Sequence, residues 1–179
     1  SKHKSEGSRG SFAVLGPSGS GRTSILARLL QTSEKVGLKS LSLKPDRAGI
    51  DAALKAMGNS DTVIFIDDLD KCTRDEIKQL ASALEKDPDG ALLVFSGRNS
   101  EEDISANSDV ITSAPTACIG TLNPLTRTEL IATLKQQGMT SGTAALIGRR
   151  FHAEFSGLPK PSMEQLHALI DAEWLIRRE

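Results

Sequence analysis

The stretch FAVLGPSGSGRTS at residues 12–24 decides the fold. It begins as an apolar strand and continues into GPSGSGRT at 16–23, the spacing of a phosphate-binding P-loop with Arg22 where that pattern has Lys. The glycines let backbone N–H groups converge on a polyphosphate in conformations that a Cβ forbids. A helix expected from Gly21 directs its positive end at the same anion.

The segment therefore predicts a loop that binds the phosphates of a nucleotide. Thr23 would offer its hydroxyl to Mg²⁺, and Arg22 would offer its charge to the terminal phosphates. The expected phosphate-binding residues are Gly16, Pro17, Ser18, Gly19, Ser20, Gly21, Arg22, Thr23 and Ser24.

Composition narrows the function classes. The 179 residues are 38% hydrophobic and 25% charged, an ordinary globular mixture with a net charge of −1. One Trp, no Tyr and five Phe argue against a base-stacking nucleic-acid platform, and the charge argues against a general basic field. Two distant cysteines match no metal spacing, and no membrane span or signal peptide is seen, so a cytoplasmic protein is expected. Residues 1–10 are expected to be a flexible basic tail.

Apolar runs alternate with helical patterns along the first two thirds of the chain. Strands are expected at 12–15, 38–43, 63–66, 91–95 and 117–122, with helices at 23–30, 46–57 and 73–84 between them. Thr73 and Glu76 have the spacing of a capping box. From Leu125 onward the pattern is helical only, with helices expected at 127–137, 142–155 and 162–177.

This alternation predicts an α/β fold: three αβα layers around a five-stranded, mostly parallel sheet that carries the P-loop, followed by a small all-helical appendage. The expected domains are a nucleotide-binding α/β domain at 11–123 and a helical lid at 124–179.

Two further clusters of polar residues follow strands. Val63–Ile66 delivers Asp67 and Asp68 to the carboxyl edge of the sheet, where ligands of open α/β folds bind. Asp67 is expected to hold Mg²⁺ with Thr23, and Asp68 to polarise the attacking water. Asp70 is interpreted as a loop or cap carboxylate. After the fourth strand, Arg98 or Ser96 would report on the γ-phosphate, with Asn99 as the fallback.

The three motifs together resemble P-loop ATPases of the AAA+ and STAND group, over residues 10–175. IDDLDKC at 66–72 is especially similar to the second acidic motif of KAP and NACHT-like signalling ATPases. The resemblance implies that Arg98 acts as a nucleotide sensor. It also implies that residues 119–134 form the linker into a helical lid. GLPK at 157–160 resembles the lid element in which Pro159 packs near the base, and Lys160 stands where related ATPases carry a second sensor.

Three departures from that group shape the functional prediction. Arg22 replaces a compact cation with a planar guanidinium, so binding is expected to survive while hydrolysis slows. Asp68 stands where many AAA+ enzymes place Glu, and residues 101–116 contain no Arg that could act on a neighbouring subunit. These features favour a slow nucleotide-dependent switch, an ATPase of low turnover that binds ATP or ADP with Mg²⁺.

Other interpretations stay open at this stage. One is a DNA-associated ATPase of the loader or transposition-regulator class, which the charge does not favour. Another is a degenerate scaffold that binds nucleotide weakly or not at all. The expected partners are a purine nucleotide, other proteins or further domains of the same protein, and a nucleotide-dependent homo-oligomer remains open.

Overall fold

The computed structural model describes residues 10–98 and 118–171. The expected tail at 1–9, Asn99 and the arginine-free stretch at 101–116 lie outside these described residues. The described residues form two compact units. The sheet unit comprises 10–16, 22–98 and 118–122, and the helical unit comprises 17–21 and 123–171.

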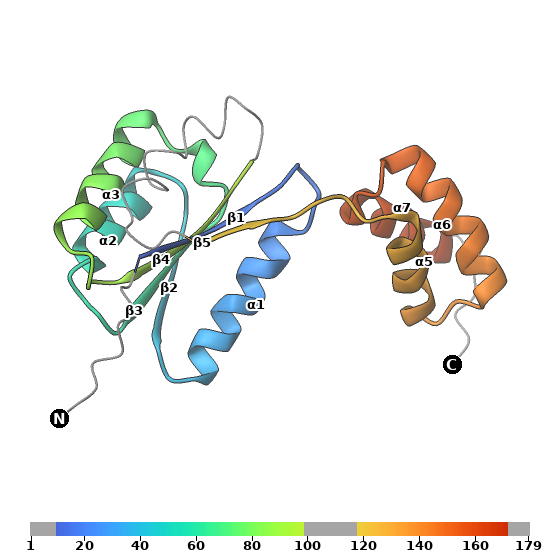
Figure 1. The fold of residues 1–179 in the computed structure, drawn as a ribbon, viewed down its shortest axis with the longest axis horizontal. Coiled ribbons are helices and arrows are strands. Elements are labelled where there is room, and N and C mark those ends of the chain that lie inside the picture. The colour runs from blue at the N-terminus through green and yellow to red at the C-terminus, as the bar shows by residue number, and fades with distance from the viewer. Residues whose placement is uncertain (1–9, 99–117, 172–179) are drawn as a thin grey trace. The chain divides into compact units, whose positions relative to one another are not determined.

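The sheet unit is built on five strands in the order β2-β3-β4-β1-β5, and every neighbouring pair is parallel (Figure 1). The strands are β1 Ser11–Leu15, β2 Lys39–Leu43, β3 Thr62–Ile66, β4 Leu92–Gly97 and β5 Cys118–Thr121. Parallel neighbours need crossover connections. The connections between successive strands from β1 to β4 contain the helices α1 Arg22–Lys35, α2 Arg47–Ala56 and α3 Arg74–Lys86.

Helices cover both faces of this sheet, which confirms the expected three-layer fold. Successive side chains of a strand point to opposite faces. In β3, Ile64 and Ile66 pack in one core with α2 and α3, whereas Val63 and Phe65 pack in a second core with Leu26 of α1. β3 is therefore buried on both faces, and its accessible groups lie at the strand end.

The ends of the helices follow local sequence signals. α3 begins with the expected capping box, in which Thr73 and Glu76 bond each other's backbone N–H groups. α1 continues to Lys35, five residues beyond the expected end, and stops where Gly37 adopts a φ of 81°. The N–H of Leu38 then donates to the carbonyl of Ser33 at 3.0 Å, a glycine-dependent helix ending.

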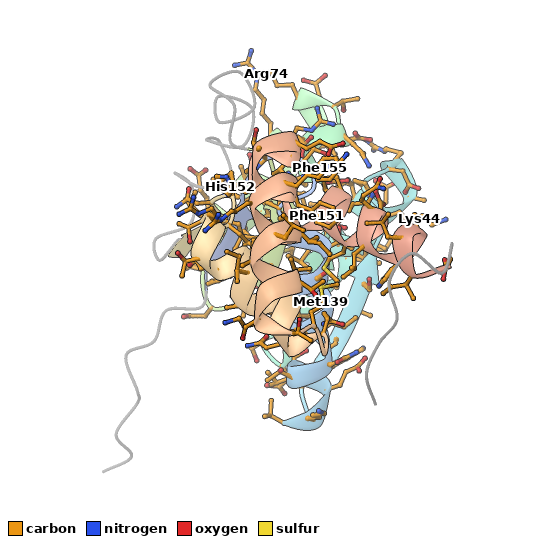
Figure 2. All side chains as sticks on the ribbon, turned by 90° about the vertical axis from the view of Figure 1, so that its right-hand side faces the viewer. Lys44, Arg74, Met139, Phe151, His152 and Phe155 are labelled. Carbon is orange, nitrogen blue, oxygen red and sulfur yellow. The ribbon has the colours of Figure 1, made fainter. Side chains whose placement is uncertain are left out.

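The helical unit contains α5 Arg127–Gln136, α6 Ser141–Phe155 and α7 Pro159–Asp171 around a separate apolar core. That core comprises Leu130, Leu134, Ala144, Phe151 and Leu166. In Figure 2, Phe151 and Phe155 lie on one side of α6 and His152 on the other. α7 begins three residues earlier than expected because a proline is tolerated at the first helical position, where its missing N–H is not needed.

Candidate functional site

The P-loop leaves β1 as the sequence predicts. The N–H of Gly16 donates to the carbonyl of Gly97, at the end of neighbouring β4, over 3.3 Å. Gly19 and Gly21 adopt φ values of 82° and 96°, which residues with a Cβ rarely occupy. The hydroxyl of Ser20 is buried and has no hydrogen-bond partner among the described residues. Ser18 and Ser24 are exposed.

Thr23 and Asp67 meet at the carboxyl edge of the sheet unit. The Thr23 hydroxyl donates to Oδ2 of Asp67 at 2.6 Å, and the buried hydroxyl of Ser96 donates to Oδ1 of the same carboxylate. Three elements thus converge here: the start of α1, the end of β3 and the end of β4. A recess of about 160 Å³ beside Thr23 and Asp67 is lined otherwise by apolar side chains and Ser42.

Asp68 follows in a strained backbone conformation, with a φ of 54° and a ψ of 53°. Such a conformation costs about 1–3 kcal/mol in a residue other than glycine. Its N–H donates to the Ser96 hydroxyl at 2.8 Å. Both carboxylate oxygens are ion-paired, Oδ1 with Nη2 of Arg22 at 2.9 Å and Oδ2 with Nζ of Lys71 at 2.7 Å. The Asp68 hydrogen bond and charge raise the pKa of Lys71.

Arg22, the residue that departs from the P-loop pattern, is buried with 8% of its side chain exposed. Its Nη1 lies 3.9 Å from Oδ1 of Asp70 but has no hydrogen-bond partner among the described residues. A buried donor without an acceptor is costly, because it has lost water and gained nothing in return. A phosphate oxygen is an acceptor that would satisfy Nη1 of this guanidinium.

Asp70, which the sequence suggests is a loop or cap carboxylate, lies beside both Arg22 and Arg98 in the structure. It lies in a short 3₁₀ helix, η1 Leu69–Lys71, which the sequence did not predict, and only 6% of its side chain is exposed. Oδ1 accepts the backbone N–H of Arg98 at 3.2 Å, and Oδ2 lies 3.5 Å from Nε of the same residue. The available signal was Arg22 itself, since a buried guanidinium needs carboxylates around it.

The structure separates the two residues proposed to sense the γ-phosphate. Ser96 is fully buried and binds Asp67 and the backbone of Asp68. Arg98 is half exposed and lies against Asp70. Ser96 thus orients the carboxylates, whereas Arg98 is the one with a solvent-facing charge.

Pro159 and Lys160 lie at the start of α7, next to the P-loop residues 17–21 of the same helical unit. The N–H of Lys160 donates to the carbonyl of Gly19 at 3.2 Å, and Pro159 begins α7. The ammonium group of Lys160 lies in an exposed pair, 3.9 Å from Oε1 of Glu164. The backbone of Lys160 therefore contacts the phosphate loop, while its charge is directed to a neighbour on α7.

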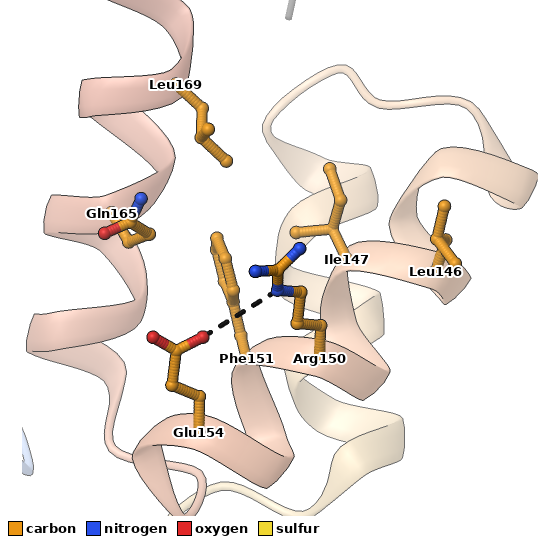
Figure 3. Close-up of a pocket in the computed structure, with 7 residues that line it drawn as sticks. All are labelled: Leu146, Ile147, Arg150, Phe151, Glu154, Gln165 and Leu169. Atoms are coloured by element: carbon orange, nitrogen blue, oxygen red, sulfur yellow. Dashed lines mark ion pairs between the residues drawn. The ribbon is translucent and has the colours of Figure 1, made fainter. Parts of the chain in front are cut away.

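A second hollow lies within the helical unit, between α6 and α7 (Figure 3). It has a volume of about 410 Å³ and is lined mainly by apolar side chains, including Ile147, Phe151 and Leu169. Arg150 and Glu154 form an ion pair of 3.9 Å in its wall. The charged groups of the P-loop and the strand ends take no part in this hollow.

Comparisons with known proteins agree with this arrangement. The family described as the KAP family P-loop domain matches residues 14–86. The Thermotoga maritima RuvB Holliday junction branch migration motor is similar in structure, with a TM-score of 0.64, 17% identity and 95% of this chain covered. The chain contains a P-loop NTPase domain. A RuvB variant structure from the same organism matches with a TM-score of 0.63 and 17% identity. This chain spans 58% of the length of both RuvB chains. No curated protein matches.

The residues of the P-loop NTPase domain fit a nucleotide with a magnesium ion. Within the sheet unit, the unsatisfied donor of Arg22 suits a phosphate oxygen, and the oxygens of Thr23 and Asp67 suit a hard cation. In the described part of the chain, no group of three or more His, Cys, Asp or Glu residues could hold a metal. Magnesium commonly takes the rest of its ligands from waters and substrate phosphates. No helix among the described residues is long and apolar enough to cross a membrane.

Proposed function

We propose that this P-loop NTPase domain binds Mg-ATP, hydrolyses it slowly and acts as a nucleotide-dependent switch in a larger cytoplasmic protein. The observation that carries the proposal is the 2.6 Å hydrogen bond between Thr23 of the P-loop and Asp67 at the end of β3. This bond brings together a hydroxyl and a carboxylate that are 44 residues apart in sequence, at the end of a buried strand. Together they supply the oxygen ligands that a phosphate-bound Mg²⁺ takes from a protein.

Each residue has a distinct proposed role in binding. The backbone N–H groups of residues 16–23 would bind the phosphates, as the glycine conformations allow. Thr23 and Asp67 would hold Mg²⁺, which when bound neutralises charge on the phosphates. Arg22 would satisfy its unpaired Nη1 on a terminal phosphate oxygen, and Arg98 would add a second charge there.

Slow hydrolysis follows from the surroundings of Asp68. A general base must accept a proton from water, and a carboxylate with both oxygens ion-paired is less accessible to that water. Asp68 is held by Arg22 and Lys71 in this way. Its oxygen Oδ1 becomes available to water only when Arg22 moves toward phosphate, so binding and activation of the base are linked.

The switch role is supported by the contact between the P-loop and the first turn of α7. Within the helical unit, the carbonyl of Gly19 accepts the N–H of Lys160, and Pro161 lies 3.4 Å from the position of a Cβ at Gly19. A change in loop conformation on nucleotide binding therefore acts directly on α7. A ligand that binds one loop conformation better shifts the population of the attached helices.

Thermal unfolding with and without nucleotide tests the binding proposal. At about 100 times its Kd, a ligand of the folded state adds about 2.7 kcal/mol to the free energy of unfolding. We expect a rise in Tm with Mg-ATP and with Mg-ADP, and a much smaller rise in the Asp67→Asn variant. An Asp89→Asn variant, which removes the same charge from an exposed turn, is the matched control. No shift with any purine nucleotide would reject the proposal and favour a scaffold.

Thermotoga maritima RuvB is a Holliday junction branch migration motor, and the similarity of this chain to it concerns the fold. Duplex DNA attracts basic surfaces, whereas this chain carries a net charge of −1. The charge does not favour DNA binding, which is the alternative function. DNA affinity that falls steeply as salt rises would favour it over the switch.

A further inference from the structure

The geometry points to Asp70 as a positioning residue that aligns Arg22 and Arg98 and thereby sets the discrimination between ATP and ADP. This inference rests on the proposed nucleotide function. It concerns a carboxylate that takes no part in the proposed magnesium or water chemistry. Its action is on the two arginines that would read the terminal phosphate.

Asp70 touches both arginines with different atoms. Oδ1 receives the backbone N–H of Arg98 at 3.2 Å and lies 3.9 Å from Nη1 of Arg22, while Oδ2 lies 3.5 Å from Nε of Arg98. With 6% of its side chain exposed, the carboxylate is shielded from the water that weakens surface ion pairs. One buried carboxylate therefore joins the P-loop to the end of β4.

Arg22 lies against two carboxylates, those of Asp68 and Asp70. Its Nη2 bonds Asp68 at 2.9 Å while its Nη1 faces Asp70, so one planar guanidinium spans both groups. A lysine ammonium is a compact point charge and has no such fork. Asp70 and Arg22 thus act as a matched pair, and the unfilled hydrogen bond of Nη1 is left for the nucleotide.

The side-chain position of Arg98 depends on Asp70 more strongly than that of Arg22 does, because Arg22 also pairs with Asp68. In the part of the chain that the structure describes, Asp70 is the group that holds the side chain of Arg98, which is otherwise 53% exposed. Without that carboxylate, the guanidinium would sample many rotamers in water and lose side-chain entropy on meeting a phosphate. A pre-aligned arginine pair favours the ligand with the additional terminal phosphate, because ADP offers no γ-phosphate to it.

Equilibrium titration of the 179-residue chain with Mg-ATP and with Mg-ADP tests this role. We expect the wild type to prefer ATP, and Asp70→Asn to lower the ratio of ATP to ADP affinity about tenfold, the size of one charge-assisted hydrogen bond. ADP affinity should change little. The exposed Asp89→Asn variant, with the same loss of charge, should leave the ratio unchanged.

A double-variant comparison separates positioning from loss of structure. If Asp70 acts through Arg98, Asp70→Asn should have little further effect on the ratio in an Arg98→Gln background. Asp70→Glu, which restores the charge, should recover part of the ratio even if Asp70→Asn folds poorly. Far-UV circular dichroism of each variant checks folding.

The outcomes are distinguishable. A wild type that binds neither nucleotide rejects the proposed function and this inference with it. A wild type that binds both equally, or an Asp70→Asn variant with an unchanged ratio, overturns the inference alone. An Asp70→Asn variant that binds ATP more tightly also overturns it, because Asp70 would then compete with phosphate for Arg22.

Discussion

The two units of this chain place their charged residues in opposite ways. In the sheet unit, Arg22 and Asp70 are 8% and 6% exposed and converge on the ends of β1, β3 and β4. In the helical unit, Arg150 and Glu154 are 82% and 52% exposed and pair along one helix. Removing charges from water is costly unless other groups compensate them. Buried charges that converge from several elements therefore indicate a site, whereas exposed pairs indicate a surface.

The apolar cores show no comparable contrast. Each unit buries leucine side chains completely, such as Leu80 in the sheet unit and Leu134 in the helical unit. The two units also end helices alike: Gly138 has a φ of 89° after α5, as Gly37 does after α1. Core packing and helix ends are thus alike in the two units, and the charged groups around the strand ends distinguish the sheet unit.

The largest expected effect comes from Asp68→Asn in the sheet unit. General-base catalysis contributes about 10²–10⁴-fold to a rate, and the amide cannot accept a proton from water. We expect single-turnover release of phosphate from ATP to fall by that factor while Mg-ATP binding persists. Glu154→Gln, which removes a surface carboxylate from the helical unit, is the control. An unchanged rate in Asp68→Asn would show that Asp68 is not the base.

The second prediction compares the cores. Leu134→Ala and Leu80→Ala each remove a completely buried side chain and should lower the free energy of unfolding by about 2–5 kcal/mol. Urea unfolding measures the loss, and hydrogen exchange identifies the elements that open. Leu134→Ala should expose α5 to α7 first and Leu80→Ala the sheet. Loss of protection throughout the chain in both variants would show that the units unfold together.

Sequence reasoning reached the fold because it depends on local patterns. The apolar strands, the P-loop glycines and the capping box of Thr73 and Glu76 each determine their own conformation. Parallel strand order then brings Asp67 to Thr23 without further information. The contacts of Asp70 could not be predicted from local patterns, because they depend on an unpredicted 3₁₀ turn and on burial beside Arg22. The end of α1 was predictable from Gly37, a signal that the apolar pattern alone does not contain.

The third prediction uses the same capping box in both units. Backbone and hydroxyl hydrogen bonds from Thr73 lower the pKa of Glu76, and those from the hydroxyl and backbone of Thr126 lower the pKa of Glu129. A carboxylate whose pKa is lower in the folded state stabilises it above the unfolded pKa, about 4.3 for Glu. That stabilisation is lost as the pH falls through the folded pKa.

Glutamine keeps the geometry of the box but does not titrate. Thermal unfolding between pH 7 and pH 3 should therefore depend less on pH in Glu129→Gln and in Glu76→Gln than in the wild type. Similar flattening in the two variants would show that the boxes are equivalent. Wild-type pH dependence in either variant would mean that its carboxylate does not cap the helix in solution.

The smallest expected effect is that of Arg150→Gln, in the wall of the hollow between α6 and α7 (Figure 3). Its Nε lies 3.9 Å from Glu154, and water reaches both side chains, so the pair should contribute at most about 0.5 kcal/mol. Urea unfolding and Mg-ATP affinity should both stay at wild-type values within that limit. Arg22→Gln removes the same charge from the sheet unit and should weaken Mg-ATP binding, because its guanidinium is buried among carboxylates and lacks an acceptor for Nη1. Equal effects of the two variants would contradict the view that burial and convergence, rather than charge itself, distinguish the site from the surface.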